Sequence, residues 1–92
     1  MLGQRINELR VASGWNQVQL AEKLNISKQT VSNWENENIQ PSIEMLIRLA
    51  KLFCVSTDYL LGLEHTPHIN TQDLPVEFVA HLVQIINDYK HK

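Results

Sequence analysis

The chain has 92 residues, of which 43% are apolar and 20% are charged, a composition typical of one small soluble globular domain. No apolar run approaches the roughly 20 residues that span a bilayer, and the N-terminus lacks the apolar block of a signal peptide, so we expect a cytoplasmic protein without membrane contact. The net charge of −2 argues against a uniformly basic nucleic-acid-binding surface. Any positive surface would have to come from the placement of the basic residues.

Two short helices are predicted at the start of the chain. Apolar residues recur at helical spacing over residues 3–13, and Gly14 ends that helix. A second helix follows, with Asn16 as its N-cap, Gln19 as the capping-box partner and Asn25 at its end. The inward positions of this second helix are predicted to be Val18, Leu20, Ala21 and Leu24.

A third helix is predicted over residues 28–36. Ser27 provides its cap, and Val31 and Trp34 are spaced three apart, as two inward residues of a helix should be. Ile26 is expected to be an apolar plug in the turn that joins this helix to the second one. Residues 17–34 therefore predict a short helix, a turn and another short helix that share one core.

Residues 37–41 form a polar loop, because the residue before a proline is disfavoured in the helical region. Ser42 then caps a fourth helix, Ser56 caps a short fifth helix, and Gly62 closes the fifth. The apolar stripe of the fourth helix is predicted to contain Ile43, Met45, Leu46, Leu49, Ala50 and Phe53. Five helices within residues 1–64 predict a compact all-α bundle.

The composition changes after residue 64. Residues 65–73 are predicted to be a linker, and an amphipathic helix is predicted over residues 74–92, with Asp73 as its cap and Pro75 in its first turn. An apolar arc after a linker is a common dimerisation device. The residues expected at this pairing surface are Phe78, Val79, Leu82, Val83, Ile86 and Tyr89. Two alternatives stay open: the helix folds back onto its own bundle, or it binds a helix of another protein.

Neither thiol chemistry nor metal binding is predicted. Cys54 lies among apolar neighbours, so we expect a buried small side chain, with a reactive thiol sensor as the alternative. The histidines lie in the predicted linker and last helix without a further ligand set: His65, His68, His81 and His91. We therefore expect no metal. We also expect no cofactor and no enzyme activity, because the sequence contains no catalytic or phosphate-binding motif.

The outer face of the predicted third helix is rich in amides and hydroxyls. Lys28, Gln29, Ser32 and Asn33 lie on that face, and Thr30 lies at its flank. Gln and Asn can pair with adenine, Lys can bond to guanine, and Ser or Thr can reach a base or a phosphate. An ordinary solvated face would more often carry Glu and Lys pairs. The face is therefore typical of a helix that reads DNA, and Ala21 is small enough to let the predicted second and third helices cross closely.

Residues 1–64 resemble the DNA-binding domain of the Cro/cI-type (XRE) repressors of phages and bacteria. The resemblance is carried by Gln17, by QLAEKLNIS at 19–27, by VSNWEN at 31–36, by Pro41 with Ser42, and by LxxLAKLFxVSxDYLLG at 46–62. It covers about two-thirds of the chain and implies a five-helix lambda-repressor-like domain with the appended helix beyond it.

The resemblance also implies roles for individual residues. Gln17 matches a residue that touches phosphate and braces the reading helix, and Arg10 and Glu35 match an ion pair found in several relatives. Glu37 departs from the family, whose members often carry Gly, Lys or Arg there, so a carboxylate is expected to face phosphate and weaken binding. The residues expected at the DNA are Gln17, Ser27, Lys28, Gln29, Thr30, Ser32, Asn33, Asn36 and Asn38.

The sequence thus predicts a sequence-specific regulator of transcription, and we expect these 92 residues to be too few for a separate ligand-sensing domain. We expect a homodimeric repressor that reads a palindromic operator in the major groove of double-stranded DNA with the helix at 28–36. The alternative is a protein-interaction module or an antitoxin whose terminal helix binds a partner protein.

Overall fold

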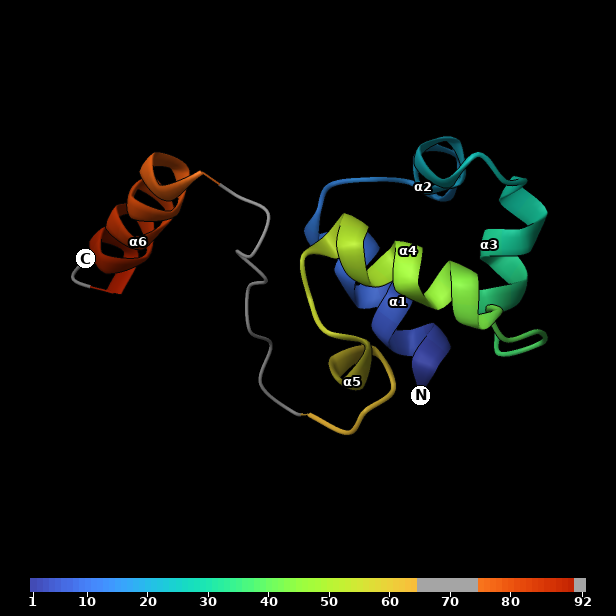
Figure 1. Cartoon of the computed structure of the whole chain (residues 1–92). Helices are drawn as coiled ribbons and strands as arrows, with labels where there is room; N and C mark the ends of the chain where they lie inside the picture. The colour runs from blue at the N-terminus through green and yellow to red at the C-terminus, as the bar shows by residue number, and fades with distance from the viewer. Residues whose placement is uncertain (65–74, 91–92) are drawn as a thin grey trace.

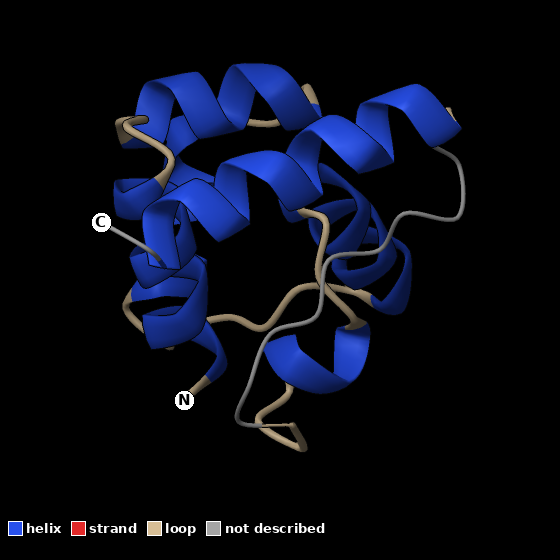
Figure 2. Ribbon diagram, turned by 90° about the vertical axis from the view of Figure 1, so that its left-hand side faces the viewer, coloured by secondary structure: helices blue, strands red, loops and turns tan. Residues whose placement is uncertain are grey.

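The computed structural model describes residues 1–64 and 75–90, and within these ranges every regular element is a helix (Figure 1, Figure 2). The helices are α1 (Leu2–Ala12), α2 (Gln17–Leu24), α3 (Lys28–Glu35), α4 (Ile43–Phe53), α5 (Thr57–Leu60) and α6 (Val76–Lys90). The predicted all-α fold is confirmed, and the helix ends differ from the expected ones by one or two residues. The predicted linker and its cap Asp73 lie outside the described residues.

Side chains cap four of the helices as the sequence predicts. Asn16 Oδ1 accepts a hydrogen bond from the Gln19 amide at 2.8 Å, and Gln19 Oε1 accepts one from the Asn16 amide at 2.8 Å, which completes the capping box of α2. The hydroxyls of Ser27, Ser42 and Ser56 each accept a bond from the amide three residues further on. These caps place the helix starts of the bundle.

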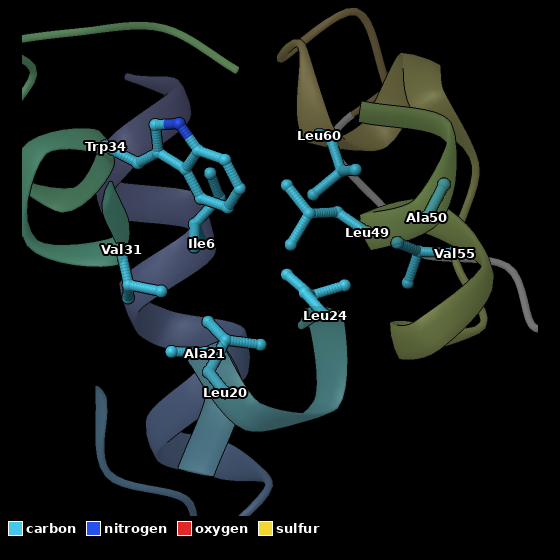
Figure 3. Packing of buried hydrophobic residues seen from close by; sticks show 10 residues of the cluster. All are labelled: Ile6, Leu20, Ala21, Leu24, Val31, Trp34, Leu49, Ala50, Val55 and Leu60. Atoms are coloured by element: carbon cyan, nitrogen blue, oxygen red, sulfur yellow. The ribbon is translucent and has the colours of Figure 1, made fainter. Parts of the chain in front are cut away.

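The core draws on all five helices of residues 1–64, whose side chains converge in Figure 3. Its buried members are Ile6, Leu20, Ala21, Leu24, Val31, Trp34, Leu49, Ala50, Val55 and Leu60. Helix α3 packs against both α1 and α2 through Val31 and Trp34. Ala21 is 3% exposed on the neighbouring helix, as expected for a small residue at a close helix crossing.

Three residues expected inside lie at the surface. Val18 is 45% exposed, because it is two residues from Leu20 and therefore points to nearly the opposite side of a short helix. Ile43 is 79% exposed as the first residue of α4. Cys54 is also exposed: it takes a left-handed conformation (φ +56°) at the end of α4, and this reversal turns the next residue, Val55, into the core.

Helix α6 carries its apolar residues on about half of its circumference, yet none of its residues is buried. Those expected to pair are exposed or only half-buried: Phe78, Val79, Leu82, Val83, Ile86 and Tyr89. Glu77, His81, Gln84 and Asp88 occupy the opposite side. Helix α6 is therefore strongly two-sided and contributes nothing to the core of residues 1–64.

Two substitutions in α4 should distinguish a core residue from an exposed one by their effects on the free energy of unfolding. Leu49 is 0% exposed, so we expect Leu49→Ala to lower the free energy of unfolding by about 2–5 kcal/mol. Ile43→Ala on the same helix should change it by less than about 0.5 kcal/mol. Urea denaturation of both variants measures this, and equal losses would contradict the core assignment.

Candidate nucleic-acid interface

The side of α3 that faces away from the core carries the polar residues predicted to read DNA. Helix α3 lies at one edge of the bundle (Figure 1), held there from within by Val31 and Trp34. Lys28 and Gln29 are exposed, and Ser32 and Asn33 are half-buried on the same outer side. The structure therefore brings these four residues together on one surface.

Two amides on this surface are joined to each other. Gln29 Nε2 donates to Asn33 Oδ1 at 3.1 Å, one helical turn apart. Each amide keeps further donor and acceptor capacity, because an amide group carries two N–H donors and an oxygen with two lone pairs. The single bond between Gln29 and Asn33 therefore leaves most of the hydrogen-bonding capacity of the two amides available to a ligand.

The N-terminus of α3 carries a second polar group of residues. The hydroxyls of Ser27 and Thr30 lie 2.8 Å apart, and Ser27 Oγ also accepts a bond from the Thr30 amide. Both side chains are thereby committed to the helix start. A helix N-terminus presents free N–H groups and a partial positive charge, which suits an anion such as phosphate.

The loop after α3 brings Asn36 and Asn38 to the surface. Asn36 Nδ2 donates to Ser32 Oγ at 3.3 Å, and the Asn38 amide donates to the Asn33 carbonyl at 2.9 Å. Both asparagines are exposed. They lie at the C-terminal end of α3, whereas Ser27 and Thr30 lie at its start.

Glu35, the last residue of α3, is the centre of a hydrogen-bond network. From α1, Arg10 Nε donates to Glu35 Oε2 at 2.6 Å and Arg10 Nη2 donates to Glu35 Oε1 at 3.0 Å. The expected ion pair is therefore present and bidentate. The Arg10 and Glu35 side chains are only 12% and 5% exposed. Arg10 also donates to the Trp15 carbonyl at 2.8 Å, which ties the same guanidinium to the chain before α2.

Two amides complete this network. Asn7 Nδ2 donates to Glu35 Oε1 at 2.8 Å, and Gln17 Nε2 donates to the same oxygen at 3.2 Å. Burial raises the pKa of Glu35, but the bonds from Arg10, Asn7 and Gln17 outweigh burial and hold that pKa below its ordinary value. The bond to Glu35 raises the pKa of Arg10 in turn.

Sequence reasoning missed Asn7 and misplaced Glu37. Asn7 is one helical turn before Arg10 on α1, and that spacing was the available signal. Glu37 was expected to face phosphate, but its carboxylate turns to the start of α1 instead, where it accepts bonds from the Gly3 amide and from the Met1 ammonium. The Met1 ammonium and then the Gly3 amide lower the pKa of Glu37.

The described residues offer no cluster of three or more metal-ligating side chains, and none of their helices is long and apolar enough to cross a membrane. His81 is exposed on α6, while His65, His68 and His91 lie outside the described ranges.

Known proteins share both the sequence and the fold. The profile of a family described as helix-turn-helix matches residues 6–60. The chain is 38% identical over 87 residues to the HTH-type transcriptional regulator ImmR of Bacillus subtilis (strain 168), with 95% of this chain and 68% of that protein covered. Across three curated relatives, the chain spans 60 to 68% of their length.

Two solved structures extend this similarity. The P22 c2 repressor in complex with a synthetic operator has a TM-score of 0.62 and 32% identity, covering 65% of this chain and 91% of that chain. A SinR–SinI protein complex has a TM-score of 0.65 and 28% identity, covering 96% of this chain and 81% of that chain.

The Glu35 network should set the acid stability of the bundle. A carboxyl with a lowered pKa stabilises the fold fully above its ordinary value of 4.5, and this stabilisation is lost as the pH falls through the lowered value. We expect Glu35→Gln to cost about 3 kcal/mol at pH 7, because it leaves the Arg10 charge without its counterion. The difference from the wild type should shrink as the pH falls below about 4.5.

Thermal unfolding from pH 7 to pH 2 measures this effect. Glu22→Gln, which changes an exposed carboxylate on α2, is the matched control and should shift the free energy of unfolding by under about 0.5 kcal/mol. A Glu35→Gln variant with the acid profile of the wild type would refute the role of the network.

Proposed function

The chain belongs to the helix-turn-helix family of DNA-binding transcriptional regulators, and on this premise we propose that it is a dimeric repressor that reads a palindromic operator through α3. The observation that carries the proposal is the outer face of α3, where the Gln29–Asn33 amide pair lies beside Lys28. Side-chain amides can form paired bonds to adenine, and lysine can bond to the acceptors of guanine in the major groove. We infer that these three residues contact bases.

The remaining polar residues of the surface are assigned to the DNA backbone. Ser27 and Thr30 lie at the N-terminus of α3, and Asn36 and Asn38 lie in the loop beyond its other end. Ser32 lies between these groups and can reach either a base or a phosphate. Gln17 combines its bond to Glu35 with a place at the start of α2, so we assign it a phosphate contact as well. Such contacts fix register and leave sequence readout to the bases.

The charge distribution supports binding despite the net charge of −2. Both acidic residues at the end of α3 are engaged by cationic or N–H donors: Glu35 by Arg10, and Glu37 by the start of α1. Lys28 is exposed at the beginning of the same helix. The local potential at this surface is therefore more favourable to phosphate than the overall composition suggests.

Selection of binding sites from random duplex DNA at near-physiological salt tests base reading. We expect the full chain to enrich a palindrome, and the triple variant Lys28→Ala, Gln29→Ala, Asn33→Ala to lose it. Lys51→Ala removes an exposed charge from α4, on the side that Lys23 and Arg48 also line, and should enrich the same sequence. Failure of the wild-type chain to enrich any sequence would reject the proposal.

Helix α6 is proposed as the dimerisation element. Val79, Leu82 and Ile86 form the centre of its apolar arc, and none of the three is among the residues that pack against the core of residues 1–64. Pairing with the same helix of a second chain would bury the arc by two-fold symmetry. Two α3 helices could then enter successive major grooves about 34 Å apart, which is why the operator should be palindromic.

Charged substitutions in this arc test the dimer. We expect Leu82→Lys with Ile86→Lys to give monomers in sedimentation equilibrium, because two ammonium groups cannot be buried at an apolar interface. The matched control, His81→Lys with Gln84→Lys, places two lysines on the polar side of α6 and should stay dimeric. A dimeric arc variant would exclude α6 as the interface.

A partner protein is the second candidate for the arc of α6. The solved SinR–SinI complex matches 96% of this chain, so the similarity extends beyond the helix-turn-helix bundle. An antagonist helix could occupy the same apolar arc that a second copy would use. Monomers of the wild-type chain at micromolar concentration would favour this candidate over the homodimer, with an antirepressor or toxin as the type of partner.

We further propose that the protein works in the cytoplasm and regulates by binding alone, without catalysis. Its role there would be to occupy promoter DNA, and its relatives in Bacillus subtilis are named as transcriptional regulators.

A further inference from the structure

Glu37 occupies a backbone position that normally favours glycine. Its amide donates to the Trp34 carbonyl at 3.1 Å, and the next amide, that of Asn38, donates to the Asn33 carbonyl at 2.9 Å. These two bonds close α3 in a Schellman motif, whose left-handed residue is usually Gly and sometimes Asn. Glu37 takes this conformation with φ +63°, so the chain tolerates a backbone strain that glycine would avoid.

The side chain of Glu37 makes a contact that glycine could not make. Its Oε1 accepts a hydrogen bond from the Gly3 amide, 34 residues away in the sequence, and its Oε2 lies 2.9 Å from the Met1 ammonium. Helix α1 has no side-chain cap of its own at Met1, and its first turn contains no acidic residue. Glu37 therefore supplies, from the far end of α3, the acceptor that α1 lacks locally.

The contact is close on both sides. Gly3 is buried, and a Cβ added there would collide with the Trp34 carbonyl and with Glu37 Oε1. The loop after α3 is thus tied to α1 at Met1 and at Gly3, and the close approach leaves no room for a side chain larger than that of glycine. Asn36 and Asn38 directly flank the tied residue.

We propose that Glu37 is a positioning residue for DNA binding: its carboxylate ties the loop to α1, so that Asn36 and Asn38 are held ready for phosphate. This inference rests on the proposed function, since it needs a DNA-facing loop. Two costs accompany Glu37, the left-handed backbone and a negative charge near phosphate. Both costs predict that replacing Glu37 strengthens DNA binding. The positioning role predicts that DNA binding weakens whenever the hydrogen bond to the Gly3 amide is lost.

Two neutral amides separate charge from reach. Glu37→Gln removes the charge but keeps the length, so its Oε1 can still accept from the Gly3 amide. Glu37→Asn is one methylene shorter, although Asn is better tolerated in the left-handed conformation. If only backbone strain and charge matter, Glu37→Asn should bind DNA at least as tightly as Glu37→Gln. If the positioning role is correct, Glu37→Asn should bind DNA more weakly than Glu37→Gln.

The experiment measures Kd for the duplex that the wild-type chain enriches from random DNA, together with the melting temperature and the Gly3 amide proton shift. We expect Glu37→Gln to bind as tightly as the wild type or more tightly. We expect Glu37→Asn to bind about 3- to 10-fold more weakly than Glu37→Gln, the range that loss of one hydrogen bond gives. The Gly3 proton should stay displaced downfield only where the acceptor still reaches it.

Equal Kd values for the Gln and Asn variants would overturn the positioning role, as would an unchanged Gly3 shift in Glu37→Asn. The positioning role would also be overturned if the melting temperature of Glu37→Asn fell so far that the variant is partly unfolded at the assay temperature. General unfolding would then explain the weaker Kd. Absence of any enriched duplex for the wild type would reject the proposed function itself and the inference with it.

Discussion

The bidentate ion pair between Arg10 and Glu35 fixes the position of α3 in the bundle. Glu35 is the last residue of α3, and its carboxylate accepts bonds from Arg10 and Asn7 on α1 and from Gln17 on α2. The hydrophobic core holds α3 only through one side, at Val31 and Trp34, and such packing permits rotation and sliding more readily than directed hydrogen bonds do. The side chains on the exposed face of α3 keep a defined position because directional hydrogen bonds fix the buried end of the helix.

Ion pairing also resolves the conflict between a net charge of −2 and a DNA-binding surface. What phosphate meets is the local arrangement of charge rather than the sum over the chain. Glu35 is covered by Arg10, and the half-exposed carboxylate of Glu37 is paired with the start of α1, so neither acidic residue at the end of α3 lacks a cationic or N–H partner. The acidic residues of this region serve the fold, and the neutral polar ones are left at the surface.

Local signals in the sequence predicted most of the fold, and long-range contacts account for what was missed. The caps at Asn16, Ser27, Ser42 and Ser56 depend on residues three apart, so they could be read directly. The outward turn of Cys54 and the tie between Glu37 and Gly3 could not, because each depends on a left-handed residue and on a neighbour that the fold supplies. In the candidate site, the outer face of α3 followed from helical spacing, whereas the Gln29–Asn33 bond and the role of Asn7 needed coordinates.

Helix α6 would gain stability from a partner outside residues 1–64. An isolated helix of 15 residues is marginal in water, since nucleation is costly and only packing of an apolar face repays it. The buried core of residues 1–64 forms without α6, since Ile6, Leu20 and Leu49 are fully buried there by other residues of the bundle. A second copy of α6 would supply an equally apolar surface and, through its symmetry, a second α3 at a fixed separation. Dimerisation would therefore stabilise α6 and, in the same step, extend the DNA-reading surface to two α3 helices.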